Sequence, residues 1–239
     1  MRSVTSQLIE RMRERILAGI YAPGAALRQD VLAAEYGTSK IPVREALVRL
    51  QSEGLVNIFP HRGFQVRPLA TSELDEIFNL RLLMEPAAAA TGATLASMAE
   101  QRAAAAALSG LNAAVAADEF ASFGRLNRAF HLQLLVPRAQ PVTSEILGRL
   151  HTLAQRYVQT HLQPDGRAQR AAREHSALLA AWRARKPARV RELLCAHIES
   201  TRNDLARAVG AAGEQEPRPM PGTRPLSWSQ QQNSKAGQE

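Results

Sequence analysis

The sequence has few of the features that would place a protein outside the cell or in a membrane. Its 239 residues include one cysteine, Cys195, so no internal disulfide can form and nothing requires an oxidising compartment. No uncharged run reaches the ~18–20 apolar residues that a membrane-spanning helix needs. Arg11, Arg13 and Arg15 occupy the stretch where a secretory signal has its apolar centre. We therefore expect a soluble, cytoplasmic protein with no membrane partner.

Aromatic residues are also scarce, at 5%, whereas alanine is abundant, which is typical of a helix-rich protein. Hydrophobic residues make up 45% of the chain and charged residues 22%, so the chain can bury a core and wholesale disorder is excluded. Lys and Arg number 30 against 22 Asp and Glu, a formal charge of +8. An excess of this size favours contact with a polyanion without requiring it.

Composition divides the chain into three segments. Residues 1–70 have a higher density of positive charge than the rest and alternate short helical and turn patterns. Residues 71–212 read as one helix after another. Residues 213–239 are rich in proline and glutamine and hold few apolar groups, so we expect a disordered tail there.

The first segment predicts a winged helix-turn-helix. Gly37 separates two short helical patterns by a tight turn, Ser39 is placed to cap the helix that follows it, and Gly54 ends that helix. Two β-prone runs joined by a short turn then indicate a hairpin. The predicted elements are helices over Val4–Gly19, Arg28–Glu35 and 39–53, and strands over Val56–Phe59 and Phe64–Arg67.

The third of these helices carries candidate DNA-contacting residues. Lys40 and Arg44 lie one turn apart near its N-terminal end, which is the end of a recognition helix that enters the major groove. The hairpin tip, His61-Arg62-Gly63, offers a cation and a flexible backbone where a wing meets phosphates or the minor groove. The alternative is that these are solvated surface cations and an ordinary β-turn.

These residues resemble a known family, the GntR family of bacterial transcription regulators. The likeness covers residues 5–70 and is carried by Ser39-Lys40-Ile41-Pro42-Val43-Arg44-Glu45-Ala46-Leu47, then Leu50, Glu53-Gly54-Leu55-Val56 and Arg62-Gly63. It implies a homodimer that binds double-stranded operator DNA, with contacts from Ser39, Lys40, Arg44, His61, Arg62 and Gly63. Lys40 departs from the family, which usually has arginine there, and a lysine cannot offer guanine a bidentate fork.

The second segment predicts an antiparallel bundle of six helices, giving a mainly α chain. The expected helices span 72–90, 97–116, 118–135, 141–161, 166–184 and 187–209, with prolines and a glycine at or between their ends.

Three histidines fall on inward-facing stripes of three of these helices. They are His131, which lies one turn after Asn127, and His175 and His197. Neutral imidazoles from three helices can converge on one divalent transition metal, such as zinc, nickel, copper or iron, with Asn127 adding an oxygen. The alternative is three separately hydrogen-bonded core histidines. His151 and His161 show no such pattern.

This segment resembles the FadR-type effector domain, specifically its metal-binding branch, over residues 72–210. The matching residues are Asn127-x-x-Phe130-His131, Glu174-His175 and His197. The resemblance implies metal ligands at Asn127, His131, His175 and His197, zinc as the first candidate metal, and a small carboxylate effector at or beside it. Asn127 stands where aspartate is frequent, which leaves the site more positive by one unit.

Arg81 lies among apolar residues on a face that should be buried, and a buried guanidinium needs a partner. Glu85, four residues later, supplies one in a purely structural pair. The functional alternative is that Arg81 clamps the carboxylate of an effector, which the resemblance favours.

The sequence therefore predicts an effector-responsive DNA-binding regulator rather than an enzyme. Two alternatives use the same histidines: a metal-dependent enzyme acting on small carboxylates, and a metal sensor. The enzyme lacks a positioned general base, because Glu174, the nearest carboxylate in sequence, is expected to point away from the cluster.

Overall fold

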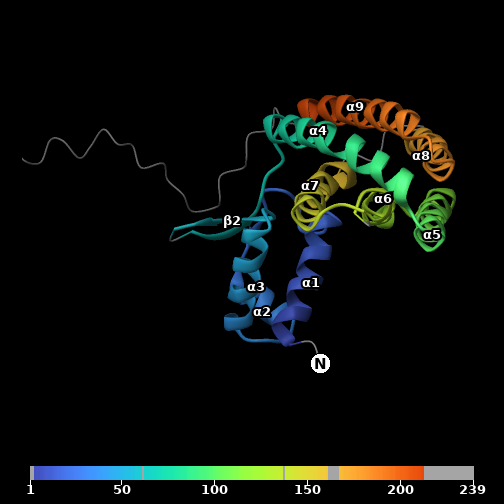
Figure 1. The fold of residues 1–239 in the computed structure, drawn as a ribbon. Helices are drawn as coiled ribbons and strands as arrows, with labels where there is room; N and C mark the ends of the chain where they lie inside the picture. The colour runs from blue at the N-terminus through green and yellow to red at the C-terminus, as the bar shows by residue number, and fades with distance from the viewer. Residues whose placement is uncertain (1–2, 61, 137, 161–166, 213–239) are drawn as a thin grey trace, which may run out of the picture.

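The computed structural model describes residues 3–60, 62–136, 138–160 and 167–212 (Figure 1). The tail at 213–239 and the candidate DNA contact His61 lie outside these ranges. The described residues form nine α-helices and one small sheet, which confirms a mainly helical chain with an N-terminal winged helix-turn-helix and a C-terminal helical bundle. No helix in the described ranges combines the length and the apolar character needed to cross a membrane.

The N-terminal helices are α1 (Val4–Leu17), α2 (Gln29–Glu35) and α3 (Lys40–Ser52). Helix α1 packs against α3, and Met12, Val43 and Leu47 are fully buried in a core separate from that of the bundle. Gly37 adopts a φ of +62° in the turn between α2 and α3, a conformation that favours glycine. Ser39 occupies the N-cap position of α3 as predicted, although its side chain makes no capping hydrogen bond.

The predicted hairpin forms β2 (Val56–Phe59) and β3 (Gly63–Val66), with Val56 opposite Val66 and Phe59 opposite Gly63. A third strand, β1 (Ala26–Leu27), pairs antiparallel with β3 and completes a sheet of order β1-β3-β2. The sequence did not reveal β1, because two residues are too few to show an alternating pattern.

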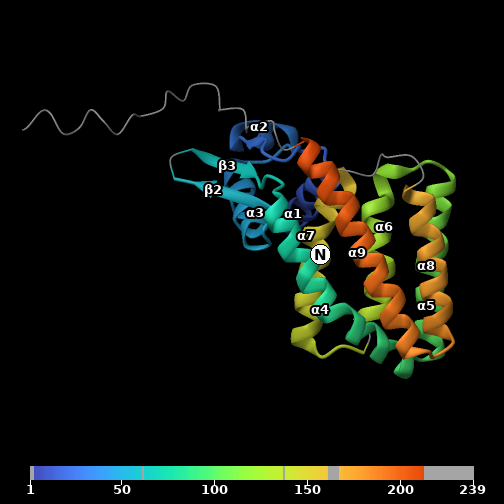
Figure 2. The same cartoon turned by 90° about the horizontal axis from the view of Figure 1, so that it is seen from above.

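The bundle contains all six predicted helices, α4 (Thr71–Leu95), α5 (Met98–Ala116), α6 (Phe120–Leu135), α7 (Pro141–Thr160), α8 (Arg167–Arg183) and α9 (Pro187–Ala212). Helix α4 extends five residues beyond its predicted end. Ser97 is the N-cap of the next helix, α5, and forms a capping box with Glu100. Helices α4 and α9 lie side by side along most of their length (Figures 1 and 2).

Close packing at the centre of the bundle depends on a small residue. A Cβ placed on Gly92 of α4 would lie 2.4 Å from the backbone oxygen of Leu134 and 3.1 Å from Nε1 of Trp182. The backbone of α4 therefore approaches α6 and α8 more closely than a larger residue would allow.

The connection between the sheet and α4 is held against α7. The buried guanidinium of Arg156 donates to the backbone oxygens of Arg67 and Pro68. The hydroxyl of the next residue, Tyr157, accepts from the backbone N–H of Ala70 at 3.3 Å. It also lies 2.7 Å from Oε2 of Glu73. We call Arg156 and Tyr157 the linker clamp.

Candidate functional site

The three predicted histidines converge inside the bundle. His131 comes from α6, His175 from α8 and His197 from α9, and one ring nitrogen of each lies within 4.8 Å of the other two. All three side chains are buried. The convergence follows from the helical stripes, because each histidine shares an inward face with leucines of the bundle core, such as Leu134 and Leu178.

The environment of these rings suits metal ligation. Burial lowers the pKa of His131 and His175 well below the usual value, which keeps both imidazoles neutral, the form that binds metal. Both nitrogens of His131 and Nδ1 of His175 lack a hydrogen-bond partner among the described residues. The Nε2 atoms of His175 and His197 lie 3.2 Å apart, and two nitrogens on one tetrahedral zinc are about 3.3 Å apart. The residues present therefore fit a divalent metal.

Glu174 contacts this cluster, contrary to the sequence-based expectation that it points away. Its Oε2 lies 2.7 Å from Nδ1 of His197, on the neighbouring helix α9. Although partial burial opposes ionisation, the hydrogen bond and the nearby charges lower the pKa of the Glu174 carboxyl. Carboxylates commonly orient metal-binding histidines in this way.

A second buried group adjoins the histidines. Arg81 Nε lies 2.5 Å from Oε1 of Glu85, so the structural pair considered from the sequence is present. Nε2 of His151 lies 3.0 Å from the same oxygen, and its ring centroid is 5.4 Å from that of His131. Glu85 is fully buried, which would raise its pKa, but Arg81 and His151 outweigh burial and lower it to about 2.

The sequence analysis did not predict that His151 lies beside the site. Its statement that His151 is not on an inward-facing stripe was wrong. The signal was present, because Leu147, Ala154 and Val158 lie on the same face of α7 and are all buried with it.

A small chamber of about 30 Å³ opens beside the cluster. Arg81 and Asn127 both line it together with His131 and His197, so the structure brings all four together. This volume is comparable to that of one water molecule in the liquid, so an organic acid would require the surrounding side chains to move. The remaining lining residues are Phe123, Val158, Arg167, Ala168, Ala171 and Thr201.

Most of the described candidate DNA contacts are exposed. Ser39, Lys40, Arg44 and Arg62 are exposed, and Gly63 begins β3 with a φ of +84°. Lys40, Arg62 and Gly63 line the same surface hollow of about 290 Å³. Arg28 lines this hollow too, while paired with Asp30 at 3.0 Å, and the sequence analysis did not single it out.

A winged helix-turn-helix joined to a helical bundle with a buried histidine centre is the architecture of a two-domain DNA-binding regulator. Comparison of the chain with models of protein families supports this class and identifies the family. The chain belongs to the GntR family of bacterial regulatory proteins, whose model matches residues 4–66, and carries an FCD domain at residues 76–200.

Individual relatives support this family assignment. The uncharacterized HTH-type transcriptional regulator BphR of Paraburkholderia xenovorans is 30% identical over 208 residues, 84% of each chain. The HTH-type transcriptional repressor GlaR of Escherichia coli is 29% identical over 207 residues, 78% of this chain and 89% of that one. The solved structure of E. coli McbR shares the fold, with a TM-score of 0.77, 24% identity and coverage of 87% of this chain and 99% of that chain.

For three other curated regulators, the match spans less than half of their length. The homologues are transcriptional regulators, not enzymes.

Proposed function

We propose that this chain is a cytoplasmic transcription regulator that binds double-stranded operator DNA as a homodimer, under the control of a small organic acid bound beside a divalent transition metal. Residues 1–70 bind DNA, and residues 71–212 bind the effector and dimerise. The buried convergence of His131, His175 and His197 is the observation that carries the proposal.

Operator contact is assigned to Ser39, Lys40 and Arg44 at the start of α3 and to His61, Arg62 and Gly63 in the wing. Support comes from the exposure of Ser39, Lys40, Arg44 and Arg62 and from the hollow that Lys40 and Arg62 share. Exposed cations are accessible to phosphates, which supply much of the affinity for DNA.

The metal is assigned to Asn127, His131, His175 and His197, with zinc as the first candidate and nickel as another. When bound, it supplies a Lewis-acidic centre for a carboxylate. Arg81 lines the same chamber and directs its guanidinium to Glu85, which leaves its remaining N–H groups to orient the acid.

Effector binding is transmitted through α7. This helix carries His151 beside the buried centre and, less than two turns later, the linker clamp that holds residues 67–70. A coupling of ~1–3 kcal/mol between the two sites changes operator affinity about 5–150-fold.

The test is a combined metal and DNA-binding assay on the full-length chain. An operator is selected from random duplexes, metal is measured by elemental analysis, and operator affinity is measured against a panel of small acids. We expect about one metal per chain and an acid that shifts operator affinity. His175→Ala should lose both the metal and the response to the acid. Ser176→Ala, which changes the exposed residue next to His175, should keep the metal and the response.

A metal-free wild-type protein would contradict the proposal. A metal sensor predicts a different result, namely that reversible metal titration changes operator affinity with no acid present.

A further inference from the structure

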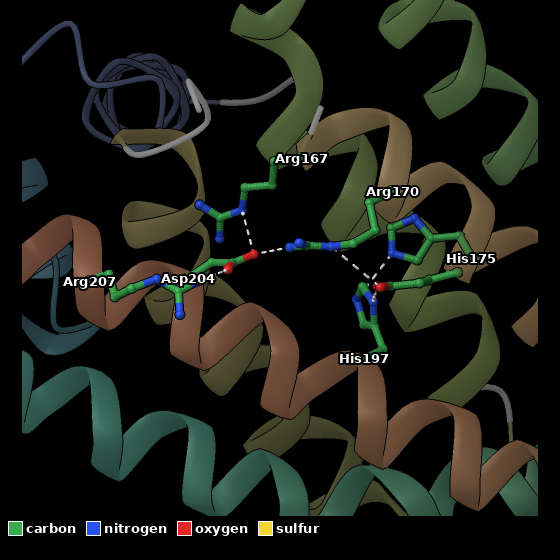
Figure 3. Close-up of polar contacts among 7 residues, drawn as sticks. Arg167, Arg170, His175, His197, Asp204 and Arg207 are labelled. Carbon is green, nitrogen blue, oxygen red and sulfur yellow. Dashed lines mark hydrogen bonds and ion pairs between the residues drawn. The ribbon is translucent and has the colours of Figure 1, made fainter. Parts of the chain in front are cut away.

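Arg128 of α6 lacks the kind of partner that Asp204 of α9 gives to its neighbours. Arg170 contacts Oδ2 of Asp204 and Arg207 contacts Oδ1 (Figure 3). The guanidinium of Arg128 meets no carboxylate among the described residues, and its buried Nε has no hydrogen-bond partner there. A buried polar atom without a partner costs free energy, and a bound ion is one way in which such a cost is removed.

Arg128 lines a cleft of about 690 Å³ between the winged helix and the bundle. One wall is formed by α1 and the C-terminal end of α3, and the other by α6 and α7. Arg49 in the first wall lies nine residues after Lys40, about 13 Å along the axis of α3, so the cleft is at the end of α3 opposite to the proposed operator contacts. No described residue lines both this cleft and the chamber beside the histidines.

The charges on the winged-helix wall of the cleft balance one another. Arg13 of α1 lies 2.5 Å from Glu10 and 2.7 Å from Glu53, and Arg49 lies 3.3 Å from Glu53. Two arginines and two glutamates therefore form a closed network on this wall, which leaves no net charge there.

The bundle wall of the cleft has more positive than negative charge. It presents Arg128 together with Arg149 and Glu145 of α7, and neither of these α7 side chains has a hydrogen-bond or ion-pair partner among the described residues. Burial, and then the like charge of Arg13 on the opposite wall, lower the pKa of Arg128. An anion between the two walls would offset this repulsion and give Arg128 a partner.

The carboxylates of the cleft restrict which anions fit. An ionised glutamate only accepts hydrogen bonds, so Glu145 repels an anion that has no proton to donate. At neutral pH a hydrogen phosphate ion keeps a hydroxyl, and a phosphorylated metabolite carries hydroxyls of its own, whereas sulfate has none. Arginine is the side chain that most often pairs with phosphate oxygens in a bidentate arrangement.

We propose that Arg128 anchors an anion site between the winged helix and the bundle, and that the ligand of this site carries a phosphate group. Arg149 supplies a second cation and Glu145 accepts a hydroxyl of the ligand. The cleft is larger than one phosphate ion, so the group is either free or part of a small metabolite. Because both domains form walls of the site, its occupancy stabilises their contact. The site is separate from the proposed metal centre and goes beyond the proposed function.

The test measures the thermal unfolding midpoint of the full-length protein at neutral pH and constant ionic strength. The probes are inorganic phosphate, glycerol 3-phosphate and sulfate, and dissociation constants follow from the rise of the midpoint with concentration. Sulfate controls for the general stabilisation that such salts give to folded proteins. At least one phosphate probe should bind about tenfold or more tightly than sulfate, before and after removal of metal. The tighter of the two phosphate probes shows whether the group is free or carried.

Variants assign the site to Arg128. Arg128→Gln should abolish the preference for phosphate over sulfate, and Arg128→Lys should restore part of it. Arg125→Gln is the matched control, because Arg125 is an exposed arginine of the same helix outside the cleft lining, so the preference should persist. Without phosphate, Arg128→Gln should unfold at a temperature no lower than the wild type, since it removes a cation that has no partner.

Equal binding of phosphate probes and sulfate to the wild type would overturn this inference. A phosphate preference that survives in Arg128→Gln would overturn the assignment to Arg128. A marked loss of stability in phosphate-free Arg128→Gln would show that this arginine serves the fold rather than a ligand. Each of these results leaves the proposed metal centre and operator binding standing, because those are measured by metal content and DNA affinity.

Discussion

The Glu174 carboxylate on α8 lies 2.7 Å from Nδ1 of His197 on α9, which directs Nε2 of that ring toward His175. An acceptor at Nδ1 keeps the proton on that nitrogen and leaves a lone pair on Nε2. The hydrogen bond therefore fixes both the tautomer and the orientation of one proposed ligand.

Glu174→Ala should weaken zinc binding about 10–100-fold, because the His197 ring loses the group that orients it. Glu174→Gln retains an acceptor and should recover part of the loss. Competition with a chromophoric chelator measures the affinity. Glu192→Ala, which removes an exposed carboxylate from α9, is the control. Equal affinity in the wild type and Glu174→Ala would contradict a positioning role.

His151 and His175 are both buried histidines, but only His175 belongs to the converging set. Elemental analysis should therefore find no metal in His175→Ala and full metal in His151→Gln. Urea unfolding should show His151→Gln destabilised by about 1–3 kcal/mol, because the buried Glu85 loses a partner. Loss of metal from His151→Gln would make His151 a ligand.

The Arg81–Glu85 pair should make stability depend on pH. The pKa of Glu85 is about 2 in the folded chain and ~4.3 in an unfolded one, so ionisation stabilises the fold above pH ~4.3 and this stabilisation is lost as the pH falls toward 2. The contribution is about 3 kcal/mol, of which roughly half disappears between pH 5 and 3.

Urea unfolding of metal-free protein checks this expectation. The double variant Arg81→Met with Glu85→Leu removes both charges and should lack this pH-dependent term. If the wild type and the double variant lost stability in parallel as the pH falls, the pair would contribute nothing to the pH dependence of the free energy of unfolding.

The linker clamp should protect the connection between the two cores. Tyr157→Phe removes the hydroxyl that contacts Ala70 and Glu73, so amide hydrogen exchange across residues 67–75 should accelerate, with a stability loss of about 1 kcal/mol. Tyr36→Phe removes a hydroxyl bonded to Tyr21 inside the winged helix and should leave that exchange unchanged. Identical exchange in both variants would show that the clamp does not restrain the linker.

Operator binding should weaken steeply with salt. Replacing Lys40 or Arg44 by Gln should reduce the slope of log affinity against log salt by about one each, provided that each contacts a phosphate. Arg191→Gln, which removes an exposed cation from α9, should leave the slope unchanged. A slope unaltered in Lys40→Gln and Arg44→Gln would place phosphate contact elsewhere. Lys40→Arg should sharpen discrimination at one base, because arginine offers guanine a rigid planar fork of donors that the flexible ammonium of lysine lacks.

The sequence predicted the features that depend on the spacing of residues along one helix. His131, His175 and His197 each lie on an apolar stripe, and the stripes meet in the bundle as expected. It did not predict contacts that depend on the distance between helices. Glu174 neighbours His175 and so projects from another side of α8, but α9 passes close enough for His197 to meet it.

The placement of Arg81 shows a further limit of sequence reasoning. Its pairing with Glu85 and its place in the chamber were treated as alternatives, yet the structure contains both. One guanidinium has several N–H groups on different edges, so it can serve a structural partner and a cavity together. Spacing along a helix cannot distinguish these uses.

The linker clamp on α7 has a consequence for engineering. Recognition of the acid is assigned to side chains of α4, α6, α8 and α9, whereas the restraint on the DNA-binding half belongs to Arg156 and Tyr157. Reprogramming such a chain as a biosensor for another metabolite thus calls for libraries at Phe123, Arg167 and Ala171. Because these three positions lie outside α7, the output of the sensor can be preserved while its input is exchanged.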